Sequence, residues 1–277
     1  MSRALSSRTR VFAVLGRPVE HSLSPVMQGA AIEARGLDAV YVALECSQPS
    51  FGGLMRGLAL AGGGGNVTLP HKAEAARRVD RPSPEVERTG ACNTFWSEDG
   101  LVYGDNTDVT GFRGAASRLV PAGLKGATVL LIGAGGAARA ALCGLIDDGV
   151  GEVRVVNRSP ESAHRLVDRL GGGRTSVIDD VRSLEGGSVD LVVQATPLGL
   201  SAADPLPFDL KRGPRIGALL DLVYSRDSTP LVEAAAAMGI PAADGREMLI
   251  LQGAAAFRRW FGDPVPVEEM RRALSRA

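Results

Sequence analysis

The amino-acid sequence predicts an α/β protein with two domains, the second of which is a doubly wound, Rossmann-type dinucleotide-binding domain. Short apolar runs typical of strands alternate with helical patterns, which is the order of an α/β fold. The run at residues 127–132 (ATVLLI) is followed at once by a glycine-rich turn and an alanine-rich helix. A chain of 277 residues is also long for one domain and comfortable for two.

The first half of the chain predicts alternating strands and helices. Strands are expected at residues 11–15, 40–44 and 66–69, and helices at residues 25–35 and 51–60. We expect Ser24 to be the N-cap of the first helix, because Pro25 would then occupy the first helical position and Gly36 would follow the last turn. The glycine runs at residues 62–65 and 171–173 are expected to be loops.

The second half predicts the elements of the dinucleotide-binding domain. Strands are expected at residues 127–132, 152–156, 190–193 and 218–223, with helices from the glycine-rich turn to about residue 147 and at residues 162–170. Two last helices, at residues 246–260 and 267–274, are expected to pack back against the first domain. The predicted domains are residues 1–110 together with 243–277, and residues 111–242, with the boundary near residues 111–126.

The composition argues against several function classes. The 31 basic residues are balanced by 31 acidic ones, so we expect no basic stripe of the kind that binds nucleic acid. No run approaches the roughly 20 apolar residues that span a bilayer, and the short apolar run near the N-terminus is no signal-peptide core. Three scattered cysteines and three histidines form no ligand motif, which favours reduced thiols, no catalytic metal and a cytoplasmic location.

The segment at residues 133–138 (GAGGAA) predicts a cofactor site. Gly133 allows a tight turn, Gly135 lets the backbone approach a pyrophosphate, and the small Ala138 allows close packing of helix on strand. The helix that follows would present free N–H groups to the anion. The expected cofactor contacts here are Gly133, Ala134, Gly135, Gly136 and Ala137. The alternative is a purely structural glycine turn.

The end of the next predicted strand indicates which nucleotide binds. Enzymes that use NAD usually carry Asp or Glu there to accept from the ribose 2′-hydroxyl. This chain has Asn157, Arg158 and Ser159 instead. A guanidinium can pair with a 2′-phosphate through two hydrogen bonds, so the sequence favours NADP (NADPH). The alternative is that Arg158 is an ordinary solvated arginine.

Three polar motifs lie outside the dinucleotide-binding segment, at the ends of short predicted strands, where α/β folds bind ligands. They are residues 16–25 (GRPVEHSLSP), residues 66–72 (NVTLPHK), and residues 104–108 (GDNTD) preceded by residues 90–94 (GACNT). Read by themselves, Ser22 and Ser24 could be helix caps, and Asn93 and Asn106 could be turn residues that stabilise their own backbone.

Taken together, these motifs resemble the shikimate dehydrogenase family, and the resemblance runs essentially from end to end. It continues through residues 221–224 (DLVY), 229–231 (TPL) and 244–252 (DGREMLILQ). The ordered set is very specific, although any single motif would not be. The resemblance implies an NADP-dependent oxidoreductase that interconverts 3-dehydroshikimate and shikimate in chorismate and aromatic amino-acid biosynthesis. It also implies that the first domain binds substrate and is separated by a cleft from the NADP-binding domain.

The resemblance also implies roles for individual residues. Ser22 and Ser24 would hold the substrate carboxylate, with Tyr224 near it, and Lys72 and Asp108 would be the catalytic pair. The residues implied to bond the ring hydroxyls are Thr68, Asn93 and Gln252. Thr196 and Gly245 are added to the cofactor contacts.

The chemistry supports Lys72 and Asp108 independently. Hydride addition to a ketone leaves negative charge on oxygen, so the site needs a positioned cation or proton donor. A lysine beside an aspartate supplies both stabilisation and a proton path. We assign Lys72 as the principal acid/base and Asp108 as its partner, and the sequence leaves the exchange of these roles open. The alternative is a surface lysine and a turn aspartate.

Gln252 lies on a predicted helix face that it shares with Met248, Ala255 and Ala256. A glutamine amide on an otherwise apolar face must find partners there. A bound ligand and a backbone carbonyl in the core are equally good partners on spacing alone, and the resemblance favours the ligand.

Two departures from the family pattern affect these expectations. Family members often have a basic residue three positions after the Ser or Thr of the Asn-Arg-Ser/Thr motif, as a second phosphate ligand, and this chain has Ser162 there. NADP preference would then be weaker than usual. In residues 194–200 (QATPLGL), Gln194 and Leu200 replace the more common Asn and Met near the nicotinamide.

Other functions remain open at this level. A relative acting on quinate or an aminoshikimate would differ from a shikimate dehydrogenase by single polar groups of its substrate. A catalytically silent sensor that binds a shikimate-like ligand is the alternative from another class, and retention of Lys72 and Asp108 argues against it. The sequence leaves the oligomeric state open, with a homodimer among the compatible states.

Overall fold

The computed structural model describes residues 5–201, 203–225 and 228–276. The chain forms two compact units. Unit 1 contains Met1–Thr107 and Leu249–Ala277, and unit 2 contains Asp108–Met248. Unit 1 is therefore built from both ends of the chain. The predicted α/β class with two domains is confirmed.

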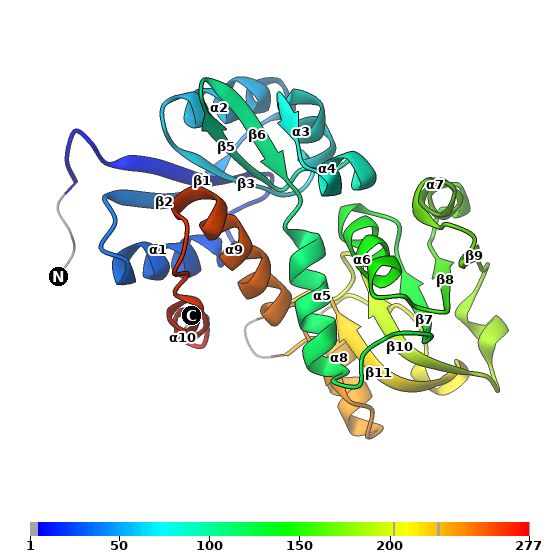
Figure 1. The fold of residues 1–277 in the computed structure, drawn as a ribbon. Coiled ribbons are helices and arrows are strands. Elements are labelled where there is room, and N and C mark those ends of the chain that lie inside the picture. The colour runs from blue at the N-terminus through cyan, green and yellow to red at the C-terminus, as the bar shows by residue number, and fades with distance from the viewer. Residues whose placement is uncertain (1–4, 202, 226–227, 277) are drawn as a thin grey trace. The chain divides into compact units, whose positions relative to one another are not determined.

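Unit 1 is a mixed sheet with helices (Figure 1). Its strands, in the spatial order β2-β1-β3-β5-β6-β4, pair in parallel except for the antiparallel pairs β3–β5 and β5–β6. The strands are β1 (Arg10–Gly16), β2 (Ala39–Glu45), β3 (Gly64–Val67), β4 (Arg81–Pro82), β5 (Thr94–Glu98) and β6 (Leu101–Asp105). The helices are α1 (Ser24–Ala34), α2 (Gln48–Leu60), α3 (Lys72–Arg78), α4 (Pro84–Thr89), α10 (Val267–Leu274) and most of α9 (Arg246–Phe261).

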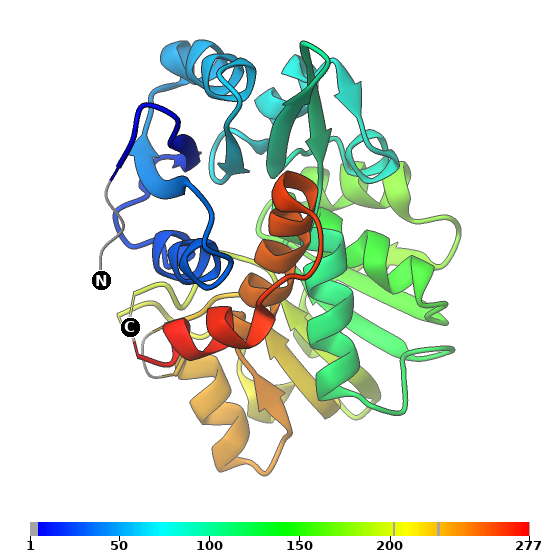
Figure 2. The same cartoon turned by 60° about the vertical axis from the view of Figure 1, so that its left-hand side comes forward.

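Strand β1 separates two apolar cores, because alternate side chains of a strand point to opposite faces. Phe12 and Val14 join a core with residues of α1, α9 and α10, including Phe257. Ala13 and Leu15 join a second core with residues of α2 and its neighbours. Helix α10 lies beside α1 (Figure 2). The expectation that the last two helices pack on the first domain is confirmed for α10 and for α9 from Leu249 onward.

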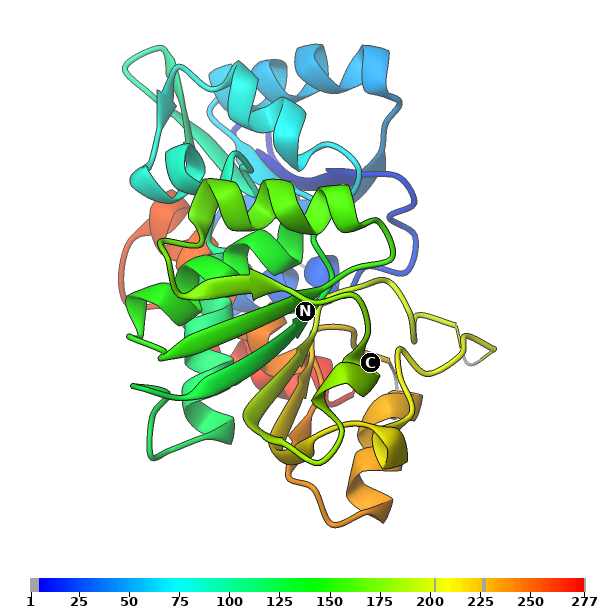
Figure 3. The ribbon, with the colours of Figure 1, turned by 90° about the vertical axis from the view of Figure 1, so that its right-hand side faces the viewer.

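Unit 2 is an all-parallel sheet in the order β12-β11-β10-β7-β8-β9, the topology of a doubly wound dinucleotide-binding fold (Figure 3). Its strands are β7 (Thr128–Ile132), β8 (Glu152–Val156), β9 (Thr175–Val177), β10 (Ser188–Gln194), β11 (Arg215–Asp221) and β12 (Ala242–Ala243). Its helices are α5 (Asp108–Leu119), α6 (Gly136–Asp147), α7 (Pro160–Leu170), α8 (Pro230–Ala237) and the short 3₁₀ turns at Val181–Leu184 and Leu210–Arg212.

The sheet of unit 2 is buried on both faces, which explains the continuous apolar run of β7. Val129 and Leu131 face a core with α5, α6 and α7. Leu130 and Ile132 face a second core that includes α8. The chain order reverses between β7 and its neighbour β10. Ligands of such folds bind beyond the carboxyl ends of the strands at this point.

Several sequence expectations were wrong in detail. The N-cap of α1 is Leu23, and Ser24 is its first helical residue. Gly64 and Gly65 belong to strand β3, which ends at Val67. Neighbouring strands leave no room for a side chain at either position: a Cβ on Gly65 would lie 2.0 Å from the carbonyl oxygen of Ala13, and one on Gly64 would lie 2.6 Å from that of Phe95. The runs at residues 62–63 and 171–173 lie outside strands and helices, as expected of loops.

The unit boundary falls at residues 107–108, where helix α5 begins, before the expected region at residues 111–126. On the second crossing, unit 2 extends to Met248, beyond the expected residue 242. Several elements were not predicted from the sequence, namely α3, α4, α5, α8, β4, β5, β6, β9 and β12. Among the described residues, no helix is both long and apolar enough to cross a membrane.

Candidate active site

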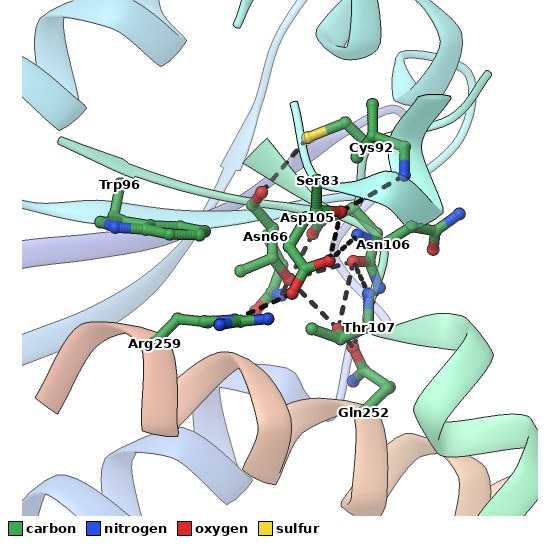
Figure 4. Close-up of polar contacts among 12 residues, drawn as sticks. Asn66, Ser83, Cys92, Trp96, Asp105, Asn106, Thr107, Gln252 and Arg259 are labelled. Atoms are coloured by element: carbon green, nitrogen blue, oxygen red, sulfur yellow. Dashed lines mark hydrogen bonds and ion pairs between the residues drawn. The ribbon is translucent and has the colours of Figure 1, made fainter. Parts of the chain in front are cut away.

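Unit 1 contains a buried cluster of amide and hydroxyl side chains formed by Asn93, Thr107 and Gln252 (Figure 4). Oδ1 of Asn93 accepts hydrogen bonds from the backbone N–H of Thr107, at 2.8 Å, and from its hydroxyl, at 3.1 Å. From the described residues, Oε1 of Gln252 accepts two long bonds, one from Nδ2 of Asn93 at 3.4 Å and one from the hydroxyl of Thr107 at 3.5 Å. Nε2 of Gln252 donates to the carbonyl oxygen of Leu249 at 2.9 Å. Two of the predicted substrate-binding residues, Asn93 and Gln252, are thus brought together.

Asn66 connects this cluster to the body of unit 1. Its Nδ2 donates to the carbonyl oxygen of Asn93 at 3.1 Å and to the hydroxyl of Thr94 at 3.0 Å. Its Oδ1 accepts from the hydroxyl of Tyr41 at 2.7 Å. Burial raises the pKa of Tyr41, whose hydroxyl also interacts with the side chain of Ser24. Tyr41 therefore stays neutral and joins Ser24 to the network.

Asp105 anchors helix α9 to the same end of the sheet. Its buried carboxylate accepts from the hydroxyl of Ser83 at 2.7 Å, from the N–H of Asn106 at 2.7 Å and from Nε of Arg259 at 2.9 Å. The guanidinium of Arg259 also lies 5.9 Å from the ring centroid of Trp96, within the range of a cation–π contact. In Figure 4, Arg259 reaches from α9 toward Asp105 and Gln252 reaches toward Thr107. One face of helix α9 therefore carries both Arg259, which holds the helix to Asp105, and Gln252, a predicted substrate-binding residue.

The other predicted residues of unit 1 lie where strands give way to helices. Ser24 is buried, and its N–H donates to the hydroxyl of Ser22 at 3.3 Å. Thr68 follows β3, and its N–H donates to Leu15 at 2.8 Å. Lys72 is the first residue of α3, is half-buried, and accepts through its carbonyl oxygen from the N–H of Cys92 at 2.9 Å.

The side chains of Asn93 and Asn106 do more than stabilise their own turns. Asn93 holds Thr107, and Nδ2 of Asn106 donates to the hydroxyl of Thr89 at 2.9 Å. Both bonds join segments 14 and 17 positions apart in the chain. The interpretation of these two residues as local turn residues alone was therefore wrong.

Asp108 and Tyr224 belong to unit 2. Asp108 is buried and begins helix α5, where the N-terminal end of the helix dipole favours a carboxylate. Tyr224 is half-buried and lies three residues after the end of β11.

The glycine-rich turn of unit 2 has the shape that a pyrophosphate needs. Gly133 has a φ of +117°, and a Cβ there would lie 2.9 Å from the carbonyl oxygen of Ala195. Gly135 is the N-cap of α6, where no side chain caps the helix, and a Cβ on it would meet nothing within 4 Å. Gly136 and Ala137 form the first turn of α6 and Ala134 precedes it. Open space in front of uncapped N–H groups fits a bound anion.

The end of β8 carries the residues expected to read the 2′-position of the ribose. Nδ2 of Asn157 donates to the carbonyl oxygen of Ser159 at 2.9 Å, and Ser159 is the N-cap of α7. Arg158 is exposed, and within the described part of the chain it forms no ion pair. The loop is thus held by its neighbours while Arg158 stays available.

Gln194 holds the loop that follows β10. Its amide donates to the carbonyl oxygens of Thr196, at 3.2 Å, and Leu198, at 2.8 Å, and its Oε1 accepts from the N–H of Thr196 at 2.5 Å. It also donates to Oδ1 of Asp221 at 3.4 Å, because the two residues are partners in the register of β10 and β11. Leu200 is exposed after this loop.

Asp221 is a buried carboxyl that organises two further segments of unit 2. It accepts from the hydroxyl of Thr229 at 2.7 Å and from the N–H of Val223 at 3.1 Å. Burial raises the pKa of Asp221 to about 6, against the smaller lowering by these hydrogen bonds. Gly245 lies against the same turn, where a Cβ would be 2.3 Å from the carbonyl oxygen of Leu222.

Sequence reasoning missed Tyr41, Thr107, Asp105 and Arg259. Thr107 and Asp105 both lie inside the GDNTD motif, so their position in the motif was a usable signal. Arg259 and Tyr41 have no local signal, because their partners are 154 and 25 positions away. Among the described residues, no group of three or more His, Cys, Asp or Glu side chains is arranged to hold a metal ion.

Family models match three parts of the chain. Residues 14–95 match the shikimate dehydrogenase substrate binding domain, residues 115–198 match shikimate / quinate 5-dehydrogenase, and residues 245–274 match the shikimate 5′-dehydrogenase C-terminal domain. These matches cover the motifs at residues 16–25, 66–72, 90–94 and 133–138, whereas residues 104–108, 221–224 and 229–231 lie outside the matched segments.

Individual relatives are similar over nearly their full length. A shikimate dehydrogenase (NADP(+)) of Rubrobacter xylanophilus is 42% identical over 98% of this chain and 97% of its own. The crystal structure of shikimate 5-dehydrogenase from Thermus thermophilus, in complex with NADP(H) and shikimate, has a TM-score of 0.86 and 37% identity, and covers 96% of this chain and 99% of its own. Quinate dehydrogenase from Corynebacterium glutamicum in complex with NAD has a TM-score of 0.86 at 28% identity, covering 97% of this chain and 99% of its own.

Proposed function

This chain belongs to the shikimate dehydrogenase family, and we propose that its catalytic groups are Lys72 and Asp108. The protein is an NADP-dependent oxidoreductase that reversibly reduces 3-dehydroshikimate to shikimate. This reaction is a step of chorismate and aromatic amino-acid biosynthesis. The proposals below concern which residues carry each part of it.

The observation that supports the substrate site best is the incomplete bonding of Gln252. Hydrogen bonds between an N–H or O–H group and oxygen are usually about 2.7–3.0 Å long. Both bonds that Oε1 of Gln252 accepts are longer, at 3.4 and 3.5 Å. A substrate hydroxyl can therefore replace them at little cost. Neutral amide and hydroxyl groups, as in Asn93, Thr107 and Thr68, suit a polyhydroxylated ring, because each can donate or accept.

We assign the carboxylate end of the substrate to Ser22, Ser24 and Tyr224. Hydroxyls can donate to a carboxylate. Ser22 and Ser24 are joined by the bond from the N–H of Ser24 to the hydroxyl of Ser22, which fixes their spacing. The hydroxyl of Tyr41 interacts with the side chain of Ser24.

Lys72 is assigned as the principal acid/base. In the direction of reduction, its ammonium group donates a proton to the ketone oxygen while that oxygen becomes negative. NADPH supplies the hydride when it is bound. Asp108 acts as the partner of Lys72 and as an acceptor for a hydroxyl of the substrate. The bond from the N–H of Cys92 to the carbonyl oxygen of Lys72 supports this assignment, because Cys92 directly precedes Asn93.

The residues of unit 2 fit NADP. The N–H groups at the start of α6, after Gly133 and Gly135, would hold the pyrophosphate. Arg158, with Asn157 and Ser159, would hold the 2′-phosphate. Thr196 and Gly245 would lie along the nicotinamide half. The proposed location is the cytoplasm, in keeping with three free, buried cysteines, and a homodimer is the assembly to test by light scattering.

Initial rates of nicotinamide reduction test the function. Shikimate, quinate and an aminoshikimate would each be measured with NADP and with NAD. We expect shikimate with NADP to give the highest kcat/KM by a large factor. A higher value with quinate would favour the alternative of a quinate/shikimate dehydrogenase, a function that one structural relative carries in its name. Binding of shikimate without turnover of any pair would favour the silent sensor.

A further inference from the structure

In the first turn of helix α7, the side chain of Ser162 is contacted by an arginine. Helix α7 starts at Pro160, after the N-cap Ser159, whose Oγ accepts from the N–H of Ser162 at 3.4 Å. The two serine hydroxyls lie 3.2 Å apart. The hydroxyl of Ser162 accepts a hydrogen bond of 2.8 Å from Nη2 of Arg165. A guanidinium is therefore attached at the position where the chain lacks a basic side chain.

Helix geometry explains why Arg165 reaches this place. Residues three apart share one face of a helix, and side chains tilt toward its N-terminus. The long side chain of Arg165 thus extends back from the second turn to the first. Arg165 is exposed, so its remaining N–H groups face solvent. Only residues 157–159 separate the end of β8 from the first turn of α7, and the ribose of a dinucleotide lies at this place in the fold.

The charges around Arg165 are mixed. Glu161 accepts from the hydroxyl of Ser159 at 2.8 Å, and this bond, followed by smaller effects that include the positive charges of Arg165 and His164, lowers the pKa of Glu161. On the neighbouring helix α6, burial lowers the pKa of Arg139, and repulsion from Arg169 and Arg165 lowers it further. Glu161 is thus one counter-charge in a region where several guanidinium groups repel one another.

We propose that Arg165, held by Ser162, is the second cation for the 2′-phosphate of NADP, beside Arg158. This inference rests on the proposed use of Arg158 by the same cofactor. A 2′-phosphate carries close to two negative charges near neutral pH and offers three acceptor oxygens, which two guanidinium groups match better than one. NAD has a hydroxyl at this position, so Arg165 contributes to binding of NADP and little to binding of NAD.

Calorimetric titration of the purified full chain separates this contact from catalysis. The probes are adenosine 2′,5′-bisphosphate, which is the phosphorylated half of NADP, and adenosine 5′-monophosphate, which lacks the 2′-phosphate. The variants are Arg165→Ala and Ser162→Ala, with Arg169→Ala as the matched control. Arg169 is an arginine one turn further along the same helix, and it is exposed as well.

We expect Arg165→Ala to weaken binding of the bisphosphate by about tenfold or more, the usual size of a lost charge-assisted hydrogen bond. Binding of the monophosphate should stay within about twofold, which also shows that the variant is folded. Ser162→Ala should weaken binding of the bisphosphate by a smaller factor, because Arg165 remains but loses its hydrogen bond to the Ser162 hydroxyl. Arg169→Ala should change it by about twofold at most, through screened charge alone.

Equal losses for Arg165→Ala and Arg169→Ala, or no loss for either, would overturn the proposal. The proposed function is tested separately by turnover of shikimate. Absence of that turnover leaves the bisphosphate titration interpretable, and a failed titration leaves the turnover result standing.

Discussion

At the scale of single residues, Lys72 is the group on which the proposed proton transfer depends. Lys72→Ala should lower kcat by about 10²- to 10⁴-fold, the usual contribution of a positioned acid or base, and change KM much less. Steady-state kinetics with shikimate and NADP measures both. Lys125→Ala, at an exposed loop lysine of unit 2, is the control and should behave as wild type. A rise in KM without a fall in kcat would show that Lys72 does not stabilise the transition state.

Arg158 is exposed and forms no ion pair within the described residues, so its charge is available to a ligand. Arg158→Asp replaces attraction by repulsion at the 2′-phosphate, while an aspartate can accept from the ribose hydroxyl of NAD. The ratio of kcat/KM for NADP to that for NAD should fall by about 100-fold, since a charged hydrogen bond is lost and a like charge is added. Arg158→Lys keeps the positive charge but loses the paired N–H groups of the guanidinium, so its ratio of kcat/KM for NADP to that for NAD should be intermediate. An unchanged ratio in Arg158→Asp would mean that other groups read the phosphate.

At the scale of elements, one face of helix α9 makes two polar contacts with other segments of unit 1. Gln252 reaches the amide cluster, and Arg259, about two turns later, pairs with Asp105. Asp105 is directly followed by Asn106 and Thr107. The pair therefore sets the position of α9 against the segment that leads into Asp108.

Arg259→Met tests this anchor. The carboxylate of Asp105 would stay buried with only Ser83 and Asn106 as donors, and we expect a loss of about 1–2 kcal/mol in the free energy of unfolding, since half of Arg259 is exposed. Urea unfolding measures it. Arg258→Met, which removes the exposed pair with Asp263, is the matched control and should cost less than about 0.5 kcal/mol. Equal costs for the two variants would show that Arg259 is no anchor.

Strands β10 and β11 are a second case in which an element sets a contact. Their parallel register makes Gln194 the partner of Asp221, and both side chains are buried. The longer side chain of Gln194, where Asn is more common in the family, spans from Asp221 to the loop at Thr196 and Leu198. The departure from the family pattern thus keeps the loop attached to the sheet.

At the scale of the whole molecule, Asp221 makes stability depend on pH. Its pKa is raised from the ordinary value of 3.8 to about 6 in the folded protein, mainly by burial. The folded state therefore binds more protons than the unfolded state between these pH values, and stability falls as pH rises through this window. Between pH 4.5 and 7, titration of this group alone should lower the free energy of unfolding by on the order of 2 kcal/mol.

Asp221→Asn removes this titration and can keep an acceptor for Val223. The difference in unfolding free energy between Asp221→Asn and wild type should therefore shift in favour of the variant by on the order of 2 kcal/mol between pH 4.5 and pH 7. Urea unfolding at the two pH values gives that difference. Asp99→Asn, in an exposed turn, is the control and should show no such shift. A pH-independent difference for Asp221→Asn would contradict the raised pKa.

Unit 1 is built from both ends of the chain because they share one apolar core. The core on one face of β1 contains Phe12 and Met27 from the start of the chain and Phe257 and Met270 from its end. Without the last segment, that face of β1 would lose much of its apolar cover. The last two helices supply this cover, because the chain path returns them to unit 1.

The sequence by itself determined the α/β class, most strands, and the helices α1, α2, α6, α7, α9 and α10. These follow from interactions within a few residues, such as the apolar run of β7 and the tight glycine turn that begins at Gly133. Short elements such as α3 and β4 were not predicted, because seven and two residues carry too little periodicity.

Only the tertiary structure decided which distant side chains meet. The bond between Asn93 and Gln252 joins residues 159 positions apart, and that between Arg259 and Asp105 joins residues 154 apart. The contact of Arg165 with Ser162, in contrast, is local, because residues three apart share one face of α7. Local preferences encode the elements, whereas pairing of polar groups in a core depends on where packing of the apolar faces places each element in space.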